Sequence, residues 1–112
     1  MFSFADLTLE ERLVLVGMLK VVVQADDLYS KEEDKRLDQI SEEMGNEVFD
    51  AAVAEAARRF KTLEEIRVNA ASVERPEARA LILETLKGMA GADGETSEET
   101  REIDALAKLW VM

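Results

Sequence analysis

Apolar residues recur three and four positions apart along almost the whole chain, and no segment alternates apolar and polar residues as a half-buried strand does. One proline and five glycines interrupt this pattern. We therefore predict an all-α fold, a bundle of about six helices that forms one domain over residues 1–112. The expected helices span about 8–25, 31–44, 47–60, 63–70, 76–89 and 97–110.

Four of these helices begin with the same signal, a serine or threonine followed three residues later by glutamate. In such a capping box each side chain accepts a hydrogen bond from the backbone of the other residue. Pro76 suits a first helical turn, and Gly45 suits a helix end. The four pairs are Thr8 with Glu11, Ser30 with Glu33, Thr62 with Glu65, and Thr96 with Glu99.

The first helix is apolar on nearly every side between Leu13 and Val23, so we expect it at the centre of the core. The other helices are amphipathic, and their apolar stripes should face it. In the third helix the stripe consists of Phe49, Ala52, Val53, Ala56, Ala57 and Phe60, where the alanines suggest close helix packing. Met18, Met44, Met89 and Trp110 also occupy apolar positions and are expected in the core.

Two parts of the chain resemble each other weakly. Leu19 aligns with Leu86, Ala25-Asp26 with Ala92-Asp93 and, after one extra residue in the first copy, Ile40 with Leu106. Each copy is an apolar helix, an acidic loop and a capped amphipathic helix. The repeat predicts a pseudo-symmetric domain with paired acidic loops, although two unrelated amphipathic hairpins could look alike by chance.

The charge balance narrows the range of partners. The chain has 25 acidic and 14 basic residues and a formal net charge of −11. This charge argues against nucleic acid and anionic membranes, and it favours cations or a protein partner with a basic surface. The longest apolar run, Leu13–Val23, is short for a membrane span and contains Lys20, and the N-terminal residues do not read as a secretory signal. We therefore expect a cytoplasmic protein.

The chain contains neither cysteine nor histidine. This excludes thiolate and imidazole metal ligands, and it excludes catalytic pairs of serine or cysteine with histidine. A bound metal would have to lie among oxygen atoms, which favours Ca²⁺ or Mg²⁺ as the only expected cofactor.

The two acidic loops, Gln24–Asp34 and Gly91–Thr100, supply the candidate ligands. A second interpretation stays open, because acidic residues in a first helical turn also cap the helix and complement its dipole, and that dipole disfavours a cation. The candidate metal ligands are Asp26, Asp27, Asp93 and Glu95 from the loops, and Glu33 and Glu99 from the first helical turns.

The second loop and the helix after it resemble the tellurite-resistance TerB family and its wider TerB-like superfamily. The residues that carry the resemblance are Ala92, Asp93, Gly94, Ser97, Glu98 and Glu99, and the first copy departs from the pattern at Asp27, where glycine would stand. The resemblance implies a cytoplasmic, non-enzymatic, all-helical domain linked to tellurite or metal stress, with a divalent-cation site at the repeat loops.

Three functional hypotheses follow. The first is a TerB-like metal-stress domain that binds a divalent cation through the acidic loops. The second is an acidic helical interaction module that docks a basic protein partner and binds no ion. The third, an enzyme that uses carboxylates as acid and base, lacks any recognisable cofactor motif or nucleophile. The first two differ in whether the acidic loops come together in space, because a single loop offers too few ligands.

Overall fold

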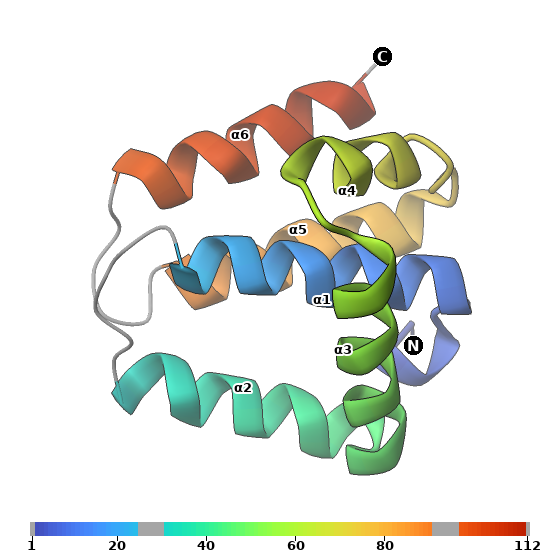
Figure 1. Cartoon of the computed structure of the whole chain (residues 1–112), viewed down its shortest axis with the longest axis vertical. Helices are drawn as coiled ribbons and strands as arrows, with labels where there is room; N and C mark the ends of the chain where they lie inside the picture. The colour runs from blue at the N-terminus through green and yellow to red at the C-terminus, as the bar shows by residue number, and fades with distance from the viewer. Residues whose placement is uncertain (1, 25–30, 91–96, 112) are drawn as a thin grey trace.

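The computed structural model describes residues 2–24, 31–90 and 97–111 (Figure 1). These residues form six α-helices and one short 3-10 helix, without any strand, which confirms the predicted all-α fold. The helices are η1 (Phe4–Asp6), α1 (Leu9–Gln24), α2 (Lys31–Met44), α3 (Asn46–Arg59), α4 (Leu63–Ala70), α5 (Pro76–Ala90) and α6 (Ser97–Val111).

Two of the predicted capping boxes are formed. The Thr8 amide donates to Glu11 Oε1 at 2.8 Å, and the Glu11 amide donates to Thr8 Oγ1 at 3.3 Å. Thr62 and Glu65 make the same pair of bonds at the start of α4, at 3.1 and 3.2 Å. Because each box satisfies backbone N–H groups that lack helical partners, it fixes where its helix begins.

The other two predicted caps, Ser30 and Thr96, lie outside the described residues. The helices that they were predicted to start begin at the expected positions, α2 at Lys31 and α6 at Ser97.

A single glycine separates α2 from α3. Gly45 has φ of 104°, in the left-handed region that side chains rarely adopt. Its amide donates to Ser41 O at 2.9 Å, and its carbonyl accepts from the Phe49 amide at 2.8 Å. The glycine therefore ends one helix and starts the next, and it fixes the angle between them.

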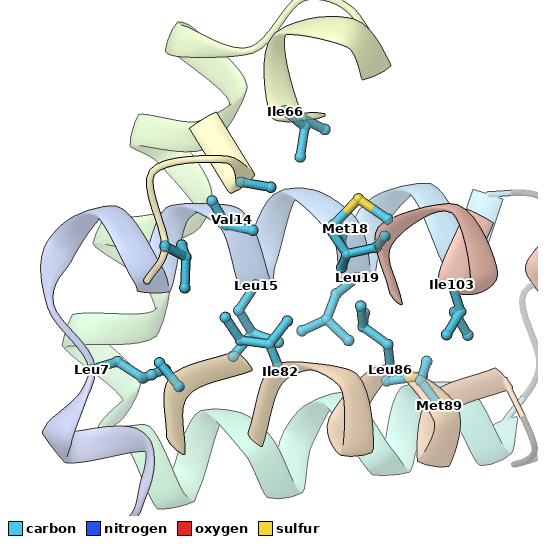
Figure 2. Packing of buried hydrophobic residues seen from close by; sticks show 14 of the residues in the cluster. Leu7, Val14, Leu15, Met18, Leu19, Ile66, Ile82, Leu86, Met89 and Ile103 are labelled. Carbon is cyan, nitrogen blue, oxygen red and sulfur yellow. The ribbon is translucent and has the colours of Figure 1, made fainter. Parts of the chain in front are cut away.

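Helix α1 runs through the centre of the fold, as predicted. Every residue from Leu13 to Leu19 is buried. Leu15 and Leu19 project toward α5, whereas Val14 and Met18 lie on the side of Ile66 in α4 (Figure 2). Full burial of one such side chain contributes roughly 1.5–3 kcal/mol. The four methionine and tryptophan positions predicted to be core, Met18, Met44, Met89 and Trp110, are buried as well.

The predicted stripe of α3 is only partly correct. Ala52 and Ala56 pack closely against α1, as the alanine spacing indicated. Val53, however, is 43% exposed, and Ala57 is exposed. The alanine row, together with Phe49 and Phe60, meets α1, whereas Val53 and Ala57 lie one position further round the helix and border open space instead of the core.

The two helical hairpins of the predicted repeat are arranged differently. Helices α1 and α5 pack side by side and run in the same direction (Figure 1). Helix α6 packs on α5, but α2 makes hardly any contact with α1 and instead packs against α3, η1 and α5. The first hairpin is therefore splayed open where the second is closed. Within the described segments, the helices are too short or too polar to cross a membrane.

Candidate functional site

The predicted metal ligands fall at the limits of the described structure. Asp26, Asp27, Asp93 and Glu95 lie outside the described residues. Glu33 and Glu99 belong to the first turns of α2 and α6, but their side chains are also outside the described part. The side chains that are described contain no group of three or more acidic residues placed to hold a metal ion.

The helix ends that precede and follow the acidic segments lie on the same side of the bundle. Gln24 at the end of α1, Ala90 at the end of α5, Lys31 at the start of α2 and Ser97 at the start of α6 are all at one end of the bundle (Figure 1). We call this the acidic end, because both acidic segments leave it and return to it. This is the arrangement that a shared site requires.

The helix dipoles at the acidic end oppose one another. The C-termini of α1 and α5 carry partial negative charge, and the N-termini of α2 and α6 carry partial positive charge. A cation near this end is attracted by two helices and repelled by two. The C-termini of α1 and α5 therefore offset the repulsion of a cation by the N-termini of α2 and α6. Whether a cation binds there depends mainly on the carboxylates.

Arg36 is a basic residue close to the acidic end that the sequence analysis did not single out. Its guanidinium lies against Gly88 in α5, so that a Cβ at Gly88 would be 3.2 Å from Arg36 Nη2. Its Nη1 also donates to Gln39 Oε1 at 3.3 Å. Arg36 thus joins α2 to the last turns of α5 and supplies positive charge there. The only sequence signal was a basic residue in the first turns of a strongly acidic helix.

A basic run, Arg58 to Lys61, lies at the C-terminal end of α3. Lys61 Nζ donates to Ala57 O at 3.2 Å, which satisfies a carbonyl at the helix end. Arg59 donates to both carboxylate oxygens of Glu10 in α1, at 2.9 and 3.0 Å. Arg58 is the main cause of a lowered pKa at Glu55, through a hydrogen bond to its carboxylate.

A pocket of about 520 Å³ lies where the first hairpin is splayed open. Residues of α1, α3 and α4 line it, and Leu37 of α2 contributes from the far side. We call it the α1–α3–α4 pocket. Sequence analysis did not predict it, although the exposed Val53 and Ala57 of α3 are part of its wall.

The charged residues that line the pocket are Lys20 and Lys61, and the described lining includes no acidic side chain. Both lysines are exposed, so they lie at its rim. Thr62 is the only other polar side chain of the lining. A pocket with this composition can hold an apolar group next to a negative charge, but it contains no pair of carboxylates for acid–base chemistry.

Comparison with known proteins gave no match: no family model, curated protein or solved structure is significantly similar to this chain.

Proposed function

We propose that this chain is a non-enzymatic TerB-like domain of the metal-stress response, which binds one divalent cation, Ca²⁺ or Mg²⁺, between its two acidic segments. The observation that supports it is that four helix ends, those of α1 and α5 and the starts of α2 and α6, lie on the same side of the bundle (Figure 1). Both acidic segments join helix ends on that side, and the proposal is that carboxylates from both surround one ion, because a single loop offers too few ligands.

A bound divalent cation would reduce the repulsion between the acidic residues of the folded domain. The chain has a formal net charge of −11, and Asp26, Asp27, Asp93 and Glu95 belong to the two segments that join α1 to α2 and α5 to α6. Like charges that are close together destabilise the folded state, and a divalent cation removes this repulsion. Oxygen ligands of this kind are the ones that Ca²⁺ and Mg²⁺ prefer. The domain would therefore be more stable with the ion bound.

The direct test is calorimetric titration of metal-free protein with Ca²⁺, Mg²⁺ and Mn²⁺. The proposal expects one ion per chain, modest affinity, and loss of binding in both Asp26→Asn and Asp93→Asn. Asp50→Asn is the matched control, because it removes one carboxylate from the exposed face of α3 and should leave binding unchanged.

Two outcomes would count against the proposal. Absence of binding to wild-type protein would favour the acidic interaction module with a basic protein partner. Binding that survives both substitutions, or that Asp50→Asn weakens equally, would show that the ion is held only by the diffuse charge of the chain.

A further inference from the structure

We propose that the α1–α3–α4 pocket is a binding site for an amphipathic monoanion, a long-chain carboxylate whose hydrocarbon tail fills the pocket and whose carboxylate lies at Lys20 and Lys61. This site is separate from the acidic end, and it does not depend on metal binding.

The pocket is a consequence of the fold. Helix α2 packs on α3 and α5 and hardly touches α1, so the side of α1 that carries Lys20 and Val21 is not covered by its hairpin partner, as α5 is by α6. Gly17 itself brings α1 close to the α3–α4 junction, since a Cβ there would lie 3.2 Å from the Phe60 ring and 3.3 Å from Ile66 Cδ1. The result is a hollow with well-packed walls.

The interior of the pocket suits a hydrocarbon chain. Its walls include Val16, Val21, Leu37, Phe49, Phe60 and Leu63, from four different helices. Polar side chains occur only at the exposed rim, so nothing inside would orient the ring nitrogens or hydroxyl groups of a cofactor. Its volume falls in the range of small-molecule sites, about 300–1,000 Å³.

The rim determines the charge of the ligand. In a chain of net charge −11, the charged side chains of the described lining are both lysines. Lys61 is held in place by its bond to Ala57 O, and Glu65 nearby is engaged by the backbone amides of Lys61 and Thr62. Because distant charges are screened beyond about 8 Å at physiological ionic strength, the two lysines dominate at the mouth. Two lysines supply the positive charge that one carboxylate needs.

The surface around the mouth favours a small ligand over a protein partner. Stable protein interfaces bury about 800 Å² on each side. Of the large apolar side chains in the described segments, Leu9, Val48, Val53 and Val68 are exposed, and only Val53 of these lines the pocket. The large apolar side chains of the pocket are therefore mostly recessed, which suits a ligand that enters the pocket better than a partner that covers its mouth.

The test is calorimetric titration with octanoate, decanoate and dodecanoate below their micelle-forming concentrations, with methyl NMR spectra to locate the site. The proposal expects one ligand per chain and affinity that rises about fourfold per methylene group, because each buried methylene adds a constant hydrophobic contribution. Methyl signals of Val53 and Leu63 should shift, and that of Val68, exposed on α4, should not.

Variants distinguish the contribution of the hydrocarbon tail to binding from that of the carboxylate. The double variant Lys20→Gln/Lys61→Gln should bind dodecanoate about tenfold more weakly than wild type and should bind dodecanol equally well. Lys87→Gln with Lys108→Gln removes the same charge from exposed positions on α5 and α6 and should change neither. Ala57→Trp fills the mouth from an exposed position and should abolish binding of both ligands, and Val53→Trp should do so from the same helix if Ala57→Trp does not fold.

The proposal is overturned by any of four results. These are no binding of dodecanoate to wild-type protein, several molecules bound per chain, dodecylammonium bound as tightly as dodecanoate, or equal weakening by the two lysine pairs.

Discussion

Arg75 holds both carboxylate oxygens of Glu11, a residue 64 positions earlier in the chain. Its Nε donates to Glu11 Oε2 at 2.9 Å, and the same carboxylate closes the capping box with the Thr8 amide. Arg75 also donates to Asp6 O and stacks over the Phe2 ring. This ion pair joins the start of α1 to the start of α5, at the opposite end of both helices from the acidic end (Figure 1).

The Glu11 carboxylate is buried, and its hydrogen bonds decide its protonation. The bond from Arg75 is the largest influence and lowers the pKa of Glu11, burial raises it, and the bond from the Thr8 backbone lowers it further. Because the pKa of the folded state lies below the ordinary value of 4.5, the stabilisation is complete above that value. It is lost as the pH falls through the lower, folded-state pKa.

Glu11→Gln should therefore destabilise the domain at neutral pH by about 1–2 kcal/mol, since glutamine keeps the cap but loses the charge-assisted bonds. The difference from wild type should shrink as the pH falls below 4.5. Urea unfolding at a series of pH values measures it. Glu84→Gln, exposed on α5, controls for the general relief of negative charge. A difference between Glu11→Gln and wild type that is independent of pH would contradict the assignment.

Substitution by alanine should change stability differently at Gly17 in α1 and at Gly88 in α5. Alanine is about 1 kcal/mol better than glycine inside a helix. A Cβ at Gly88 meets only the guanidinium end of the long Arg36 side chain, which can shift by a few tenths of an ångström, so Gly88→Ala should gain most of this energy. A Cβ at Gly17 meets Phe60 and the buried Ile66 together, so Gly17→Ala should be less stable than Gly88→Ala and should narrow the α1–α3–α4 pocket. Equal gains in melting temperature would show that α1 and the α3–α4 junction are less closely packed.

The predicted helix starts can be tested in the same way. Ser30→Ala and Thr96→Ala should each lower stability by about 1 kcal/mol with the fold intact, because each removes an N-cap. Thr62→Ala, whose hydroxyl accepts from the Glu65 amide at 3.2 Å, is the positive control. If urea midpoints fall for Thr62→Ala and for neither of the others, α2 and α6 are not capped by these residues.

Sequence predicted the features that depend on neighbours along the chain. Helix periods and the capping boxes of Thr8 and Thr62 involve residues three and four apart, and all of these appear in the structure. The central position of α1 followed from its apolar surface on all sides. The weak repeat also predicted paired acidic loops; these lie outside the described residues, and the helix ends that flank them are on the same side of the bundle (Figure 1).

The features that sequence did not predict depend on the angles between helices. The Glu11–Arg75 pair joins residues with no local relation, and neither residue type shows which partner it will find. The α1–α3–α4 pocket exists because α2 turns through Gly45 onto α3 instead of covering α1. The spacing of apolar residues shows which face of α3 is apolar, but it does not show how much of that face a neighbouring helix will cover. Val53 belongs to the apolar face and is nevertheless exposed.

The most direct test of the shared metal site is paramagnetic broadening of backbone amide signals by a small amount of Mn²⁺. The account predicts that Gln24, Lys31, Ala90 and Ser97, which flank both acidic segments, broaden together. Gly45 and Glu11, at other parts of the fold, should stay sharp, excess Mg²⁺ should reverse the effect, and Asp93→Asn should abolish it at all four positions. Broadening confined to one hairpin, or absent from both, would contradict the claim that the two acidic segments hold one ion.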